Sequence, residues 1–271
     1  MKPVLLLAPA LMLLSACIDD EATAEPGASA DATARATSSR APAPAQPTEA
    51  VAVAEADKLY AFEFAYPAEA AAIPALKAHL DAELDEARAS LVSEAKESHR
   101  SAQAEGLGFN PFERTVKWSV VAALPGWLSL FGETSEFMGG AHGNTSSAVL
   151  LWDKAAGRRR EPLSLFTSKE AFDAALGKAY CAALNAERAK RREEPVEAGS
   201  GNRFDDCVKP SDVTILLGSA DKVHFTRVGL IADAYVAGSY VEGSYEITLP
   251  VTPNLIRAVK PEYRSAFAVG R

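Results

Sequence analysis

Residue types that carry catalysis or bind metals are scarce in this chain. Its 271 residues include only three cysteines and four histidines. The histidines are scattered, no His-Glu-x-x-His sequence occurs, and so no metal-ligand spacing is present. The Gly-x-Ser-x-Gly sequence that marks many serine hydrolases is absent as well. We therefore expect no metal, no cofactor and no enzymatic activity.

An excess of positive charge is also lacking. Lys and Arg number 28 against 36 Asp and Glu, which gives a net charge of −8. Phosphate backbones are bound by a net basic face, so this balance argues against a nucleic-acid partner. It is compatible with a cationic protein partner, because opposite net charges steer encounter.

Long apolar runs are confined to the beginning of the chain. Lys2 precedes an apolar stretch over 4–14, which has signal-peptide length and is too short to span a bilayer. The following Leu14-Ser15-Ala16-Cys17 resembles a bacterial lipobox, so we predict a signal peptide over 1–17, acylation of Cys17 and attachment to the membrane by an N-terminal lipid. Ile18 in place of Asp favours the outer over the inner membrane, facing the periplasm. A signal peptide cleaved at an ordinary small-residue site is the alternative.

Residues 18–57 are predicted to form a disordered tether. They are dominated by Ala, Pro, Ser, Thr and Glu and show no apolar periodicity. Such a segment cannot bury enough surface to offset its ordering entropy. As coil, it would hold a folded domain on the order of 35 Å from the membrane.

The remaining chain predicts an α+β fold of antiparallel β-meander sheets packed with one long and one medium helix. An N-terminal half over 58–165 and a C-terminal half over 166–271 are expected to form one compact unit. Strands are expected at 59–66, 115–124, 127–137, 144–152, 212–217, 222–228 and 244–249, and helices at 69–98, 168–192 and 253–259. The Arg-rich runs at 158–160 and 188–192 are expected to be solvated.

Two cysteines, Cys181 and Cys207, remain after the leader. In an oxidising compartment two leftover thiols predict a disulfide, which would stabilise the fold by roughly 3–4 kcal/mol. The alternative is two unpaired buried thiols.

The strongest local signal is Gly139-Gly140-Ala141-His142-Gly143-Asn144, a sharp turn between two strands. A second loop, Gly229 to Gly243, is rich in Tyr and Gly. The candidate ligand-binding residues are His142, Gly140 and Asn144 from the turn and Tyr235 and Tyr240 from the loop. A glycine turn could present His142 as a catalytic base, but we favour a structural role in which it fixes the turn. Trp127 is expected to pack in the core.

Three sets of residues carry a family resemblance. They are the turn 139–144, then Trp152-Asp153 through Gly157 to Leu163-Ser164-Leu165-Phe166, then Tyr235-Val236-Ala237-Gly238 with Tyr245-Glu246-Ile247-Thr248-Leu249-Pro250. In this order the chain resembles the paired domains of the extracytoplasmic region of the anti-sigma factor RsiV and of the N-terminal region of PdaC-type peptidoglycan deacetylases. The resemblance implies an α+β domain and, in one branch, recognition of lysozyme. Neither a sigma-binding segment nor a deacetylase domain with its metal ligands is recognised, so those two activities are not carried over.

The leading hypothesis is a non-enzymatic, lipid-anchored envelope protein that binds a lysozyme-like protein or a peptidoglycan component. A cell-wall hydrolase that uses His142 with an unplaced carboxylate is the rival hypothesis. A purely structural envelope lipoprotein is the third.

Overall fold

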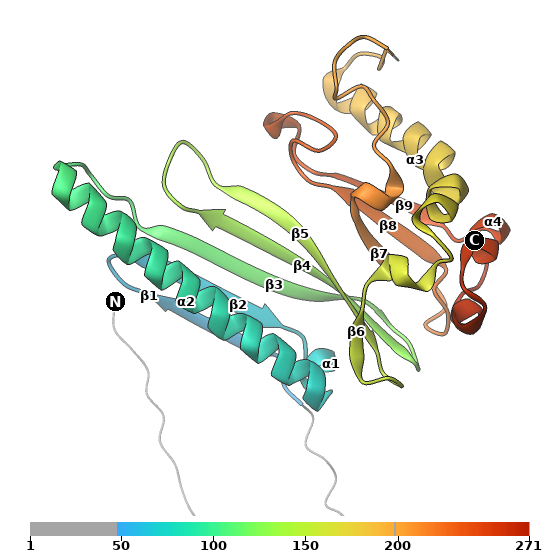
Figure 1. Ribbon diagram of the computed structural model, residues 1–271, viewed down its shortest axis with the longest axis horizontal. Coiled ribbons are helices and arrows are strands. Elements are labelled where there is room, and N and C mark those ends of the chain that lie inside the picture. The colour runs from blue at the N-terminus through green and yellow to red at the C-terminus, as the bar shows by residue number, and fades with distance from the viewer. Residues whose placement is uncertain (1–47, 198, 271) are drawn as a thin grey trace, which may run out of the picture. The chain divides into compact units, whose positions relative to one another are not determined.

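The computed structural model describes residues 48–197 and 199–270 (Figure 1). The predicted signal peptide, Cys17 and most of the predicted tether lie outside the described residues. The described part forms one compact unit. Within it, every helix is too short or too polar to cross a bilayer.

The first part of the described chain is a six-stranded sheet with the strands in sequence order. The strands are β1 (Val51–Ala56), β2 (Tyr60–Tyr66), β3 (Phe112–Ala123), β4 (Trp127–Phe137), β5 (Asn144–Asp153) and β6 (Arg158–Arg160). All neighbouring pairs are antiparallel except β2 and β3, which are parallel. Parallel pairing requires a crossover connection, and here α1 (Ala68–Ala71) and α2 (Pro74–Glu105) supply it.

Helix α2 lies along one face of this sheet (Figure 1). Strand β2 alternates, so Phe62, Phe64 and Tyr66 are buried under the helix while Glu63 is exposed on the other face. Leu76, Leu80, Leu84 and Leu91 of α2 complete this core at helical spacing. The helix begins at Pro74, where a missing N–H has no cost, and ends at Gly106 in the left-handed region (φ 68°).

The second part of the chain packs a medium helix against a three-stranded antiparallel sheet. Its elements are η1 (Pro162–Leu165), α3 (Lys169–Arg192), η2 (Pro210–Asp212), β7 (Thr214–Gly218), β8 (Arg227–Ala232), η3 (Tyr240–Glu242), β9 (Tyr245–Pro250), α4 (Pro253–Ala258) and η4 (Pro261–Ala266). Ser168 caps α3 by accepting a hydrogen bond from Ala171 N–H at 3.1 Å. The apolar side of α3 is Phe172, Leu176, Tyr180 and Leu184, each buried.

A shared core joins the two parts. Trp127 and Leu151 of the six-stranded sheet belong to the same buried cluster as α3 and β7–β9. Trp127 is 9% exposed and its ring lies 6.0 Å from that of Phe225, so the predicted core role is confirmed.

The structure confirms the predicted α+β class, with mostly antiparallel sheets, and it corrects several details. Residues 51–56, assigned to the tether, form strand β1 and pair with β2. The meander is interrupted by the parallel β2–β3 pair. The strand expected at 222–228 lies at 227–232, because Asp221 organises a tight turn there by accepting the N–H groups of Val223 and His224. Residues 158–160 form β6, with Arg160 paired to Asp153 at 3.1 Å.

Candidate functional site

The β4–β5 turn and the β8–β9 loop meet through stacked rings. The His142 ring stacks on Tyr240 with centroids 4.0 Å apart, and Tyr235 stacks on the same Tyr240 ring at 5.7 Å. The Tyr240 hydroxyl donates a hydrogen bond to the Gly143 carbonyl at 2.7 Å. Four of the residues singled out from the sequence thus lie close together, because Asn144 also lines a depression with Tyr240. Gly140 stands at the exposed tip of the turn.

The backbone at both loops requires special residues. Gly139 and Gly140 have φ of 82° and 96°, which glycine adopts without a steric penalty. At Gly143 an added Cβ would lie 2.8 Å from the Glu136 carbonyl oxygen, so only glycine fits that position. Tyr235 adopts φ 70°, uncommon for a bulky residue, which indicates that surrounding contacts hold it there.

The loop also exposes apolar side chains. Tyr235 is 50%, Val236 42% and Val241 91% exposed. We call the group His142, Tyr235, Val236, Tyr240 and Val241 the aromatic surface. Val236 and Val241 directly follow Tyr235 and Tyr240 in the chain, and Tyr is enriched among the residues that dominate protein interfaces.

Three arginines of α3 hold the β8–β9 loop in place. Arg188 Nε donates to the Ala237 carbonyl at 2.9 Å. Arg191 Nη1 donates to the carbonyls of Glu242 and Ser244 at 2.6 and 2.8 Å. Arg192 Nε pairs with the Glu242 carboxylate at 2.8 Å. The loop that carries Tyr235 and Tyr240 is therefore braced from behind by a rigid helix.

Glu242 is the acidic centre of this brace. Its carboxylate accepts hydrogen bonds from the Tyr245 hydroxyl, from Ser239 N–H and Oγ at 2.8 Å, and from Arg192. Burial opposes ionisation of this carboxyl, but the hydrogen bonds outweigh burial and lower its pKa to about 2. Glu242 is therefore charged at neutral pH and fixes the end of the loop.

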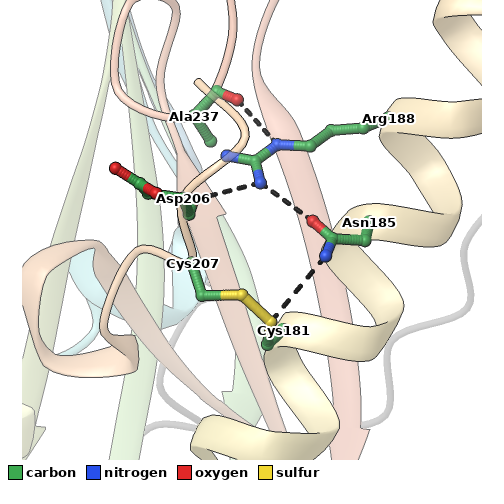
Figure 2. Close-up of a disulfide and its surroundings, with 6 residues drawn as sticks. All are labelled: Cys181, Asn185, Arg188, Asp206, Cys207 and Ala237. Carbon is green, nitrogen blue, oxygen red and sulfur yellow. Dashed lines mark hydrogen bonds between the residues drawn. A yellow bond between two sulfur atoms is a disulfide. The ribbon is translucent and has the colours of Figure 1, made fainter. Parts of the chain in front are cut away.

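The disulfide lies beside the same brace (Figure 2). Cys181 on α3 is bonded to Cys207, with their Cα atoms 5.4 Å apart, which confirms the predicted pairing. Two turns further along α3, Arg188 donates to the Asn185 side chain at 2.9 Å and to the Asp206 carbonyl at 3.1 Å (Figure 2). Helix α3, the disulfide-bonded segment and the β8–β9 loop are thereby joined through one guanidinium group.

The prediction that the 188–192 run is solvated is wrong for Arg188 and Arg192, whereas Lys190 and Arg191 are exposed. Arg188 is fully buried, and the Arg192 side chain is 15% exposed. Arg192 also pairs with Asp205 at 2.6 Å. A sequence signal for this was present, since Arg188 and Arg192 continue the four-residue spacing of Leu176, Tyr180 and Leu184 on the buried side of α3.

The start of the β8–β9 loop is fixed to the first sheet. Asp233 accepts hydrogen bonds from Ser147 N–H at 2.9 Å and Ser147 Oγ at 2.6 Å. The loop is therefore held at Asp233 by β5, at Ala237 by Arg188 and at Glu242 by Arg192. Such anchoring reduces the conformational entropy that a binding loop loses on contact with a partner.

The geometry of His142 is that of a turn residue. Its ring is exposed, and Nδ1 lies 2.9 Å from the Gly143 carbonyl, to which it donates in the tautomer protonated at that nitrogen. Its ring contact is Tyr240. Within residues 48–197 and 199–270, no three His, Cys, Asp or Glu side chains gather as a metal site would require. The arrangement offers an apolar and aromatic contact surface with hydrogen-bonding groups at its edge.

Known proteins resemble the chain in part. Residues 53–145 match a family described as Deacetylase PdaC, which spans β1 to the start of β5. A solved structure of a DUF3298 family protein from Pseudomonas aeruginosa PAO1 aligns with a TM-score of 0.50 at 18% identity, covering 83% of this chain and 99% of that one. A DUF3298 family member from Bacteroides fragilis NCTC 9343 aligns with a TM-score of 0.45 at 15% identity, covering 74% of this chain and 89% of that one. No curated protein matches.

The PdaC-type part of the predicted resemblance is therefore supported over 53–145, and the Pseudomonas structure supports the fold. The resemblance to the RsiV region stays a prediction, which rests on the residue sets at 139–144, 152–166 and 235–250.

Proposed function

We propose that the protein is a non-enzymatic, lipid-anchored binding protein of the cell envelope, which faces the periplasm from the outer membrane. Its partner is a cationic envelope protein, for which lysozyme is the named candidate, and the contact is made by the aromatic surface. The observation that carries the proposal is the braced loop that stacks Tyr235 and Tyr240 on His142 while leaving Val236 and Val241 exposed.

A protein partner fits this surface better than a sugar does. Sugar rings stack on aromatic faces, but the rings here stack on one another, and the most exposed neighbour is the aliphatic Val241. Exposed aliphatic side chains gain free energy when a protein surface covers them. The net charge of −8 favours a basic partner. The resemblance to the RsiV region supports lysozyme as the candidate, and the lipobox at Cys17 supports the anchor.

Calorimetry on the mature full chain in detergent tests the proposal, with C-type lysozyme and with soluble peptidoglycan fragments at two salt concentrations. Saturable lysozyme binding that weakens with salt is expected. Tyr235→Asn removes the ring with a residue that tolerates the same positive φ. Combined with Val241→Ser, it should weaken binding at least about tenfold, as expected for central interface residues.

Val223→Ser is the matched control, because Val223 is also exposed but lies in the turn before β8. It should leave lysozyme affinity unchanged. Binding of peptidoglycan fragments in place of lysozyme would reject the proposed partner. Lysozyme binding that is unaffected by the Tyr235 and Val241 substitutions would reject the proposed surface.

A further inference from the structure

The face of the six-stranded sheet opposite to α2 is exposed over β1–β4. The strand registers place the following residues on it: Ala52, Ala54, Ala56, Ala61, Glu63, Ala65, Glu113, Thr115, Lys117, Ser119, Phe131, Glu133, Ser135 and Phe137. We call this set the open sheet face. Most of its members are small, so another chain can approach the strands closely.

Three adjoining depressions run along the open sheet face. Their volumes are about 420, 290 and 460 Å³. The first two share Ala52, Ala65 and Lys117, and the second and third share Thr115. The third reaches Tyr240 and so adjoins the aromatic surface. From Ser119 to Glu113 along β3 the groove is about 20 Å long, the span of about six extended residues.

Carboxylates recur along this groove with the period of an extended chain. Glu113 lies on β3, Glu63 lies opposite Thr115, and Glu133 lies opposite Lys117. Residues 113, 115 and 117 are successive same-face positions of one strand, so the three carboxylates stand at levels about 6.6 Å apart. An extended peptide that runs along the strands repeats its side chains at the same interval.

The charge of the groove is not balanced within the described residues. Within the described residues, the side chains of Glu63 and Glu113 take part in no hydrogen bond or ion pair, and Lys117 is the single cation on the open sheet face. Lys117 faces Glu133 across β3 and β4 and partly neutralises that level. At Glu63 and at Glu113 the groove therefore carries a negative charge that no cation of the open sheet face offsets.

We propose that the open sheet face binds an extended basic peptide segment, with Lys or Arg at alternate positions, lying along the strands. The small side chains form the floor, and Glu63, Glu113 and Glu133 receive the cationic side chains. This surface lies beyond the aromatic surface and does not require lysozyme as the partner.

Fluorescence anisotropy with labelled hexapeptides and the full chain in detergent tests the proposal. The probes are Lys-Ser-Lys-Ser-Lys-Ser and, with the same composition, Lys-Lys-Lys-Ser-Ser-Ser. The alternating peptide should bind at least about threefold more tightly, because only its lysines match the period of the carboxylates. Equal affinity for the two peptides would show that only their charge is recognised and not its spacing, which would overturn the proposal.

Substitutions in the groove sharpen the test. Glu63→Gln with Glu113→Gln should lower the affinity for the alternating peptide by about five- to tenfold, since each exposed ion pair contributes about two- to fivefold. Lys117→Ser should raise that affinity about twofold, because Glu133 loses its neutralising neighbour. Ala54→Trp should lower the affinity, because the indole ring would occupy the groove.

The matched control is Glu86→Gln with Glu246→Gln, which makes the same charge change at exposed positions on α2 and β9. It should leave the affinity within about twofold, and an equal loss in the control would reject the groove. Tyr235→Asn should leave peptide binding unchanged. If the wild-type chain binds the alternating peptide but not lysozyme, the proposed function alone is rejected. If it binds lysozyme but not the peptide, the groove alone is rejected. Thermal unfolding of each variant confirms that it is folded.

Discussion

Replacing Glu242 by Gln should destabilise the protein by about 2–3 kcal/mol at pH 7. The amide of Gln can still accept a hydrogen bond from Ser239, but its NH2 group would face the Arg192 Nε donor now 2.8 Å from the carboxylate. The charge that Arg192 and the Tyr245 hydroxyl now meet is also removed. Arg192, whose side chain is only 15% exposed, would then keep Asp205 but lose its second carboxylate partner, and removing one member of such a mostly buried pair is costly.

The magnitude follows from the pKa of Glu242. A carboxyl with a usual value of 4.5 is held at about 2 in the fold, a difference that corresponds to about 3 kcal/mol of stability. Because the folded pKa is the lower one, this contribution is complete well above pH 4.5. It is lost at about 1.4 kcal/mol per pH unit as the pH falls toward 2. The difference between wild type and Glu242→Gln should shrink accordingly.

Urea unfolding at pH 7, 4.5 and 3.5 measures that difference. We expect the difference at pH 4.5 to be about 0.4 kcal/mol below that at pH 7, because half of the unfolded carboxyls are protonated there, and the difference at pH 3.5 to be clearly smaller. Glu246→Gln provides the control, because Glu246 is exposed on β9 close to Glu242 in the chain. It should change stability by less than about 0.5 kcal/mol. A loss below about 0.5 kcal/mol for Glu242→Gln at pH 7, or a difference independent of pH, would refute the reasoning.

Two further substitutions test the scaffold behind the aromatic surface, and a third tests the core between α2 and the six-stranded sheet. Changing Cys181 and Cys207 together to Ser removes a cross-link between residues 26 apart and should lower the free energy of unfolding by about 3 kcal/mol in urea titrations. Arg188→Met keeps much of the volume but leaves two backbone carbonyls without their donor; we expect a loss of about 2–4 kcal/mol and faster amide exchange in the β8–β9 loop. Gly132→Ala would place a Cβ 2.8 Å from the Trp118 ring and should lower the melting temperature, at a cost of about 1–3 kcal/mol.

Each of these has an outcome that contradicts it. If a reductant lowers the stability of the serine double variant as much as that of wild type, the loss of stability does not come from the disulfide. Unchanged amide exchange in Arg188→Met would remove Arg188 from the brace. Gly126→Ala serves as the control for Gly132, because a Cβ at Gly126 has nothing within 4 Å and should be tolerated.

The local sequence pattern was sufficient to predict elements that have one buried face and whose ends are marked by Pro, Gly or a capping residue. Strand β4 is found at 127–137 as predicted, because Pro125-Gly126 marks its start and the glycine turn follows its end. Helix α3 extends to Arg192 as predicted, with Ser168 as its cap. Both loops of the candidate site were singled out from their Gly and Tyr content, and the structure places them in contact.

What was missed depends on partners that are distant in the sequence. Strand β1 alternates Val and Ala, but its small side chains resemble the composition before it, and only pairing with β2 makes it a strand. The parallel β2–β3 pair follows from how α2 returns the chain, which a strand-by-strand interpretation does not capture. The buried state of Arg188 depends on carbonyl acceptors at Asp206 and Ala237, 18 and 49 residues further along the chain.

The bond from Tyr240 to Gly143 has a kinetic consequence. It joins residues 97 apart, so the entropy of closing a very long loop must be overcome before it forms. Contacts of such high sequence separation slow folding, and helix α2 or the β4–β5 hairpin can form much earlier from neighbouring residues. We therefore expect the aromatic surface to be among the last features to assemble during folding. In that order of events, a chain that presents it has already completed both halves of the fold.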